Sequence, residues 1–109
     1  MDTFTVEYFL PKVLETIEDW PADVVADYGR VLELAIEHGP TLKMPYSRTI
    51  GDGLFELRAR GSSGHARALY CFRLGRRIVV LHAFRKKTQQ TADHDLALAR
   101  KRLKEISRD

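Results

Sequence analysis

Three adjacent cations end a short apolar run in the stretch LHAFRKKTQQT at residues 81–91, and His82 lies just inside that run. One guanidinium group can donate two parallel hydrogen bonds to the oxygens of a phosphate, and ammonium groups add point charges. Histidine exchanges protons near neutral pH, so His82 is the default acid or base of such a cluster. A run of like charges is often only a solvated loop, but this one follows a predicted strand. We interpret HAFRKK as a strand end that delivers cations to a bound phosphate.

Arginines also alternate with apolar residues along two predicted strands, LFELRAR at residues 54–60 and ARALYCFRL at residues 66–74. Successive side chains of a strand point to opposite faces of a sheet, so the polar residues of both strands share one face. These polar residues are Glu56, Arg58, Arg60 and Arg67. Neighbouring arginines repel one another and fill no core, which favours phosphate binding over a stabilising role. An ion pair of Arg58 or Arg67 with Glu56, or with an acid of the N-terminal helices, is the alternative.

Hydrophobic periodicity and turn residues predict seven elements that would position these side chains. The expected elements are a strand at 4–9, a helix from Pro11, a helix at 22–37, strands at 54–60, 66–74 and 77–84, and a last helix from about Ala92 with Thr91 as its cap. This order predicts an α+β fold, in which an N-terminal strand and a helical hairpin pack on a mostly antiparallel sheet, with a C-terminal helix. If the hairpin covers the apolar face, the arginines lie on an open face. The 109 residues fit one domain spanning residues 1–109.

Charge is divided unevenly along the chain. Residues 1–40 carry nine acidic and two basic residues, whereas the remainder carries sixteen basic and six acidic residues. This division predicts a dipolar surface whose basic side binds a polyanion. No segment resembles a membrane span or a signal peptide, so we expect a cytoplasmic protein with no membrane partner. Cys71 is interpreted as a small core residue, and the spacing of the four histidines supports no metal site.

Several motifs together resemble the RelE/HigB superfamily of type II toxins, and specifically its phage-derived HigB-like branch. The motifs are GDGLFELR at residues 51–58, Arg67 three residues before Tyr70, IVVLHAFRKKTQQT at residues 78–91, and a closing helix rich in Ala, Arg and Lys. The resemblance covers nearly the whole chain. It implies a RelE-like fold and a ribosome-dependent endoribonuclease, an mRNA interferase that cuts mRNA and inhibits translation. The implied partners are the ribosome, mRNA and an inhibitory antitoxin, usually a helix-turn-helix protein from an adjacent gene, with operator DNA bound only through the antitoxin complex.

The reaction implied by this resemblance is attack of a ribose 2′-OH on the adjacent phosphate. Such a reaction needs no metal and no cofactor, but it needs a base, an acid and stabilisation of the transition-state charge. We assign catalytic roles to Arg58, Arg67, His82, Lys86 and Lys87. We assign RNA binding to Arg48, Arg60, Arg85 and Gln89. Glu56 and Tyr70 are further candidates for the acid or base. Well-studied relatives use a C-terminal tyrosine or histidine, for which Tyr70, His82 or His94 would substitute here unless the cations act with ribosomal groups.

Other interpretations of the same residues stay open. Strand alternation places Ile78, Val80, His82 and Phe84 on one face, so a hydrogen-bonded core or edge histidine also explains His82. A non-catalytic RNA-binding or ribosome-binding domain on the same fold would leave His82 and Glu56 without a chemical role. An interaction protein would instead dock an acidic partner on the basic face and bind no RNA.

Overall fold

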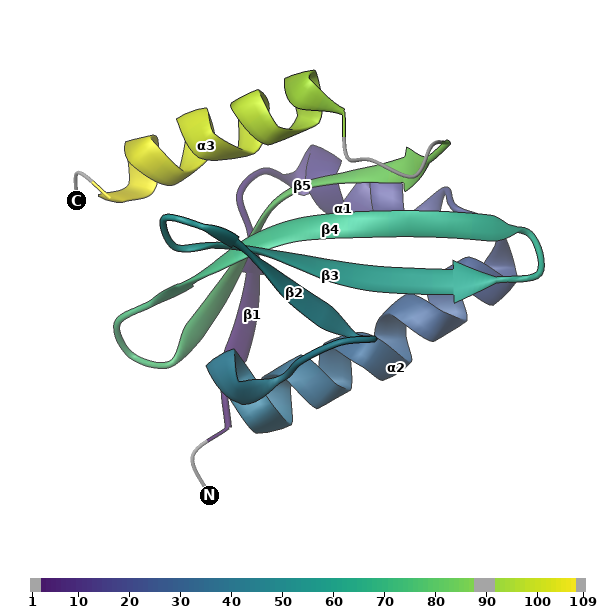
Figure 1. Cartoon of the computed structure of the whole chain (residues 1–109), viewed down its shortest axis with the longest axis horizontal. Coiled ribbons are helices and arrows are strands. Elements are labelled where there is room, and N and C mark those ends of the chain that lie inside the picture. Colours follow the sequence, from purple (N-terminus) through teal and green to yellow (C-terminus); the bar gives the residue numbers. More distant parts are fainter. Residues whose placement is uncertain (1–2, 88–91, 108–109) are drawn as a thin grey trace.

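A five-stranded sheet with helices on both of its faces forms the centre of the computed structural model, which describes residues 3–87 and 92–107 (Figure 1). The elements in chain order are β1 (Thr5–Tyr8), α1 (Pro11–Glu18), α2 (Ala22–His38), a 3-10 turn η1 (Gly39–Thr41), β2 (Ser47–Gly51), β3 (Leu54–Gly61), β4 (Gly64–Arg73), β5 (Arg77–Lys86) and α3 (Asp93–Ser107). The strand order across the sheet is β1-β5-β4-β3-β2. The predicted cap Thr91 lies outside the described residues.

The sheet is mixed, with one parallel pair. Strand β1 runs parallel to β5, whereas β2, β3, β4 and β5 form successive antiparallel pairs. The prediction of an α+β fold with an N-terminal strand, a helical hairpin, a mostly antiparallel sheet and a C-terminal helix is therefore confirmed, and the arrangement is compatible with a RelE-like fold. None of the helices in the described ranges is long and apolar enough to cross a membrane.

Strand β2 is the element that the sequence pattern did not predict. Its five residues, SRTIG, contain one aliphatic side chain, and the strand pairs only with β3 at the edge of the sheet. A short edge strand has one hydrogen-bonded neighbour and shows little hydrophobic alternation. Its position matters for the site because it places Arg48 directly opposite Glu56.

The helical hairpin buries one face of the sheet. Helix α2 packs mainly against β3, and α1 packs mainly against β5. The buried residues of the hairpin on this face are Val13 and Ile17 of α1, Trp20 between the two helices, and Val24, Tyr28, Val31 and Ala35 of α2. The buried strand residues are Leu57, Ala59, Ala66, Ala68, Tyr70, Ile78, Val80 and Ala83. The alternation predicted for β3 and β4 is confirmed, because their small and apolar side chains point toward α1 and α2.

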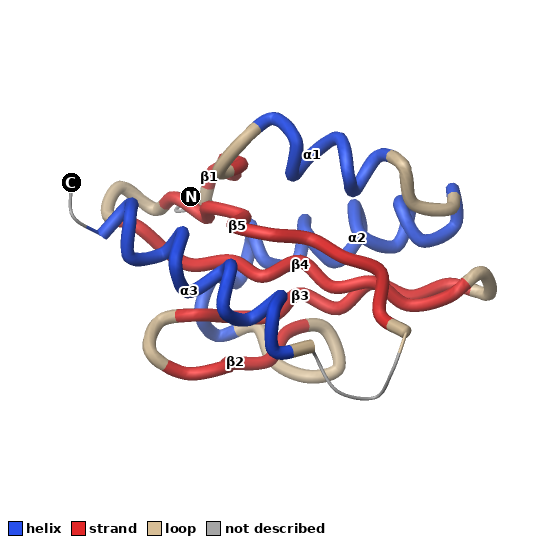
Figure 2. Tube along the Cα trace, turned by 90° about the horizontal axis from the view of Figure 1, so that it is seen from above, coloured by secondary structure: helices blue, strands red, loops and turns tan. Residues whose placement is uncertain are grey.

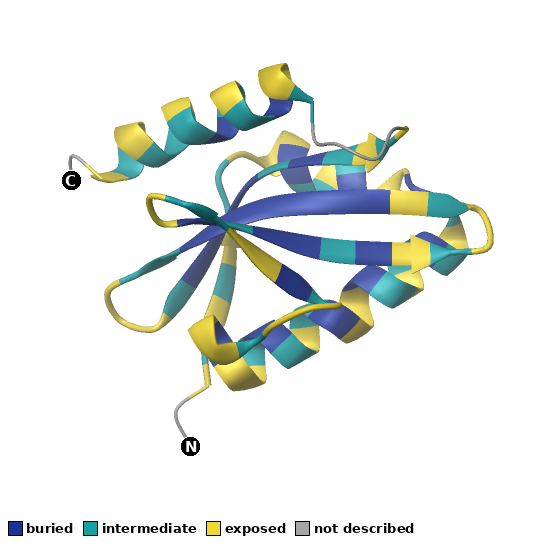
Figure 3. Ribbon diagram, viewed as in Figure 1, coloured by how far each residue is buried: buried dark blue, intermediate teal, exposed yellow. Residues whose placement is uncertain are grey.

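Helix α3 covers part of the opposite face, so the prediction that this face is open was wrong (Figure 2). The apolar residues buried beneath the helix are Leu54, Leu69, Cys71, Val79 and Leu81, and Ala99 of α3 packs against them. Burial of this apolar surface stabilises the docked helix. Figure 3 shows β4 buried along most of its length and exposed near its hairpin with β3. The uncovered part of the face is therefore the end that carries the arginines.

An irregularity in β5 changes which way His82 points. Leu69 pairs with His82, but the next residue, Tyr70, pairs with Val80, so Leu81 is an extra residue in the ladder. Such a bulge shifts the alternation of the side chains that follow it. Ile78 and Val80 accordingly face α1 and α2, whereas His82 and Phe84 face α3. The prediction that these four side chains share one face was wrong.

Candidate functional site

The strand register aligns side chains of the α3-facing side in rows that cross the sheet. Within each strand, successive rows are two residues apart, so alternate side chains lie on the same face. From β2 toward β5 the rows are Arg48–Glu56–Leu69–His82, then Arg58–Arg67–Phe84, then Arg60–His65–Lys86. The register therefore brings together arginines and a lysine that are up to 38 positions apart in the sequence.

A cationic cluster, formed by Arg48, Arg58, Arg67 and Lys86, surrounds the buried carboxylate of Glu56. Each cation comes from a different strand, β2 to β5. Oε1 of Glu56 lies 3.3 Å from Nη2 of Arg48 and 3.6 Å from Nε of Arg67. Glu56 is fully buried and Arg67 is only 3% exposed. The carboxylate therefore holds the cluster together from below, and its burial argues against a direct contact with substrate.

The cations of the cluster influence one another. Burial lowers the pKa of the Arg67 guanidinium, Arg58 and Arg48 lower it further, and Glu56 opposes the change. Burial also lowers the pKa of the Lys86 ammonium, and Arg67 is the next cause. Like charges held this close disfavour their own charged forms, and a bound anion would relieve that repulsion. The charge and proximity of these side chains therefore make the cluster suited to an anion.

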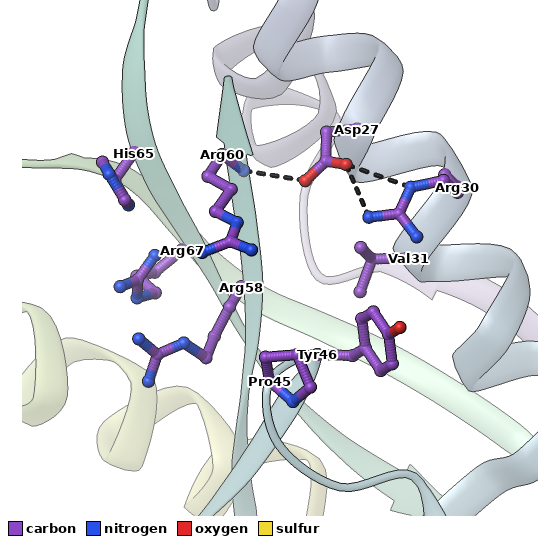
Figure 4. Close-up of a pocket in the computed structure, with 9 residues that line it drawn as sticks. All are labelled: Asp27, Arg30, Val31, Pro45, Tyr46, Arg58, Arg60, His65 and Arg67. Atoms are coloured by element: carbon purple, nitrogen blue, oxygen red, sulfur yellow. Dashed lines mark hydrogen bonds and ion pairs between the residues drawn. The ribbon is translucent and has the colours of Figure 1, made fainter. Parts of the chain in front are cut away.

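A small cavity of about 60 Å³ lies beside the cluster (Figure 4). Arg58, Arg60, Arg67 and His65 line one side, and residues of α2 and the segment before β2 line the other. At this point β3 extends beyond β2, so its outer edge has no strand partner. The N–H of Arg58 donates to Tyr46 O at 2.9 Å, and the N–H of Arg60 donates to a carboxylate of α2 at 2.8 Å. These bonds satisfy edge donors that would otherwise be open to another strand.

Two aspartates of α2 fix the hairpin between β3 and β4. Oδ2 of Asp27 accepts the Arg60 N–H, and Oδ2 of Asp23 accepts the N–H of Ser63 at 2.9 Å. Burial tends to raise the pKa of the Asp27 carboxyl, but the bonds from Arg60 and Arg30 outweigh this and hold the pKa below its usual value. The carboxylates are therefore stabilised in the charged form that accepts these bonds. They hold in place the strand ends that carry Arg60 and His65.

His82 faces the same side of the sheet as the cationic cluster, but it is hydrogen-bonded to the side chain of Asp95. Its Nε2 lies 2.6 Å from Oδ1 of Asp95, which is in the first turn of α3 and only 6% exposed. Oδ2 of the same carboxylate lies 3.5 Å from Nε2 of the exposed His94. The His82 ring also stacks on Phe84, with 5.6 Å between ring centroids. His82 therefore fits the alternative of a hydrogen-bonded edge histidine, which connects β5 to α3.

Because His82 and Asp95 are in contact, the effects of replacing each of them on the free energy of unfolding should not be additive. In a double-mutant cycle with His82→Ala and Asp95→Ala, we expect a coupling energy of about 1 to 3 kcal/mol in the free energy of unfolding, because the bond is charge-assisted and partly buried. Urea denaturation monitored by circular dichroism measures it. The exposed pair His38 and Glu37, whose side chains lie 3.9 Å apart, is the control and should couple by less than about 0.5 kcal/mol. Equal coupling in the two cycles would contradict a structural role for the buried pair.

Three of the other residues assigned from the sequence, Tyr70, Arg85 and Lys87, are not part of the cationic cluster. Tyr70 is buried on the α1 and α2 face, where its hydroxyl is 2.6 Å from Ser47 Oγ and where burial raises its pKa, so it is poorly placed as an acid or base. Arg85 points to the same face and donates from Nη2 to Ser63 O at 3.1 Å. Lys87 is exposed beyond the end of β5, and Gln89 lies outside the described residues.

The sequence interpretation overlooked His65 as a member of the site. His65 directly follows GSSG at residues 61–64, a sequence typical of a hairpin turn, and was therefore interpreted only as a turn residue. The signal that would have identified it is the same alternation that selected Arg67, because His65 lies two residues before Arg67 on β4. Within the described ranges, no group of three or more His, Cys, Asp or Glu side chains is arranged to hold a metal ion.

The fold and the site describe an α+β, RelE-like protein with a basic site at one end of its sheet. A family model described as "Phage derived protein Gp49-like (DUF891)" matches residues 15–104. The chain belongs to this family of Gp49-like phage-derived proteins. The family is a toxin-like group related to the RelE-type toxins, which are endoribonucleases. No curated protein matches the chain.

Proposed function

We propose that this protein is the toxin of a type II toxin-antitoxin system, in the HigB-like branch, and that it cleaves mRNA on the ribosome. The observation that supports this proposal most directly is the cationic cluster, in which four adjacent strands each contribute one cation around a buried carboxylate. A cluster of this kind suits a phosphodiester, because several donors contact one phosphate group. Membership of a toxin-like family related to endoribonucleases supports cleavage rather than binding alone.

In the proposed reaction, the 2′-oxygen attacks the adjacent phosphorus and the bond from phosphorus to the 5′-oxygen breaks. The products are a 2′,3′-cyclic phosphate and a 5′-hydroxyl. Arg58 and Arg67, which are directly opposite each other on β3 and β4, stabilise the additional negative charge of the transition state. Lys86 and Arg48 bind the scissile or a flanking phosphate from either side of this pair. The residues that would supply the chemistry all belong to the chain or to the ribosome, with no metal or cofactor.

The proposal includes a protein partner that keeps the toxin inactive. By resemblance this partner is an antitoxin of the helix-turn-helix type from an adjacent gene, and operator DNA is bound only through the complex of the two proteins. Without such a partner, the basic side chains of the cluster would repel one another and attract RNA without control. An antitoxin that covers the cationic cluster is expected to present carboxylates to it.

Expression of the protein alone tests the proposal. We expect arrest of growth and new cleavage sites within translated mRNA, detected by primer extension, because a ribosome-dependent nuclease acts on messages in the decoding site. Co-expression of the adjacent helix-turn-helix gene should restore growth. Normal growth and uncut mRNA, with soluble protein present, would refute the nuclease function. Binding of an acidic protein at 1:1 ratio with no affinity for RNA would instead indicate an interaction protein.

A second candidate function is supported by the positions of the proposed acids and bases. Glu56 is buried, Tyr70 faces the other side of the sheet, and His82 is bonded to Asp95. A domain that binds RNA or the ribosome without cutting it would need none of these groups. Such a domain would retain RNA in a filter-binding assay, with a strong dependence on salt concentration, and would leave the RNA intact.

A further inference from the structure

Two histidines of the described residues, His65 and His82, lie within the rows of the basic face, and of these two only His82 is hydrogen-bonded to a carboxylate, that of Asp95. His65 is the Cα partner of Arg60 on one side and of Lys86 on the other. It lines the small cavity together with Arg58 and Arg67, and Figure 4 shows it next to Arg67. Its side chain is exposed, so a substrate bound to the arginines would reach it.

The other histidines are placed differently. His82 and His94 both contact the carboxylate of Asp95, and His38 lies at the end of α2 and does not line the cavity. Among the described residues, no carboxylate forms an ion pair with His65. Its imidazole is therefore available for proton exchange with a substrate, and histidine is the side chain best suited to that exchange near neutral pH.

The order of the rows indicates which proton this imidazole transfers. In an in-line displacement, the attacking and leaving oxygens lie on opposite sides of the phosphorus. A phosphorus bound at the row of Arg58 and Arg67 has the row of His65 on one side and the row of Arg48 on the other. An arginine donates hydrogen bonds but accepts none, so Arg48 stabilises the leaving oxygen and cannot take a proton from a nucleophile. The row of Arg48 also carries Glu56 and His82, but Glu56 is fully buried and His82 is hydrogen-bonded to Asp95. The exposed proton acceptor beside the phosphorus is therefore His65.

We propose that His65 is the general base of the cleavage reaction, an inference that rests on the proposed function. Its imidazole accepts the proton of the 2′-OH while the 2′-oxygen forms its bond to phosphorus. The electron pair of the breaking bond leaves with the 5′-oxygen, which takes a proton from water. The cationic cluster and His65 together then supply charge stabilisation and proton transfer from one face of the sheet. This arrangement explains how the protein cleaves RNA although His82, Tyr70 and Glu56 are occupied or buried.

The test is single-turnover cleavage of mRNA on programmed ribosomes, measured between about pH 5 and pH 9. We expect His65→Ala to lower the cleavage rate by about 100-fold or more. The wild-type rate should fall toward acid pH as the base becomes protonated, and this dependence should disappear in His65→Ala. Added imidazole should restore part of the rate of His65→Ala, which a purely structural role would not allow. His38→Ala is the matched control and should keep both the rate and the pH profile.

The outcomes separate this inference from the proposed function. If the wild-type protein leaves mRNA uncut on ribosomes, the nuclease function itself fails, and the role of His65 fails with it. If the wild type cleaves and His65→Ala cleaves equally fast, only the role of His65 is refuted. The same conclusion follows if the acid dependence persists in His65→Ala and disappears in His82→Ala. Circular dichroism of each variant identifies any loss of activity that comes from unfolding.

Discussion

Replacement of Arg67 by alanine is expected to lower the rate of mRNA cleavage by about 100-fold or more, and to abolish growth arrest. Arg67 lies at the centre of the cationic cluster, opposite Arg58 and next to the carboxylate of Glu56. It is 3% exposed, so its guanidinium is already largely desolvated before substrate binds. A desolvated and positioned donor stabilises developing charge more strongly than one that must first lose its water. Single-turnover cleavage on programmed ribosomes measures the effect.

Two further variants make this result interpretable. Arg85→Ala removes an exposed arginine from the neighbouring strand, but on the opposite face, and it should cleave at close to the wild-type rate. Arg58→Ala removes the half-buried partner across the ladder, and it should lose activity as Arg67→Ala does. An Arg58→Ala variant that is folded and fully active would contradict the role of the pair. So would equal losses in Arg85→Ala and Arg67→Ala, because net charge alone would then explain both.

The sequence predicted the basic face because strand alternation is a local property. Arg58 and Arg67 lie on regular parts of β3 and β4, where successive side chains along the strand point to alternate faces of the sheet. Apolar alternation in the same strands, confirmed by burial of Leu57 and Ala68, determined the face. The positions of the charged residues and those of the apolar residues therefore assigned the same faces to the two strands, and the prediction needed no tertiary information.

The position of His82 could not be predicted in the same way. The bulge at Leu81 depends on how β4 and β5 align over their whole length, and no residue in VVLHAF marks it. Once alternation shifts by one position, His82 moves to the α3 face and meets Asp95 from a distant helix. The face of Tyr70, in contrast, follows from alternation, and only its role as a candidate acid or base does not fit the structure. Its spacing from Arg67 placed it near the arginine in sequence, but an odd number of residues places it on the other face.

The burial of the Glu56 carboxylate could not be predicted from the sequence either. Alternation assigned Glu56 to the polar face, and a glutamate there would normally be exposed. Strand β2, which the pattern missed, covers it from one side and brings Arg48 to 3.3 Å. A polar residue on the predicted polar face has thus become part of the interior. Its energetic role differs accordingly from that of a surface ion pair.

Removal of the Glu56 carboxylate is expected to produce the largest loss of stability of any single substitution at the site. Glu56→Ala leaves the buried Arg67 without the carboxylate that lies 3.6 Å from its Nε, and removing one partner of a buried ion pair costs about 3 to 5 kcal/mol. Urea denaturation measures the free energy of unfolding. The control is Glu7→Ala, which breaks an ion pair with Arg77 at 3.2 Å on the surface and should cost at most about 1 kcal/mol.

A double substitution separates the structural from the catalytic contribution of this pair. Glu56→Leu combined with Arg67→Met replaces two buried charges by apolar groups of similar volume, so we expect most of the lost stability to return, because the desolvation of both charges disappears together. Cleavage should nevertheless remain at least about 100-fold below wild type, because the guanidinium that stabilises the transition state is absent. Recovery of activity along with stability would show that Arg67 acts only by holding the sheet together. If stability returns without activity, the guanidinium of Arg67 is required for cleavage beyond its contribution to stability.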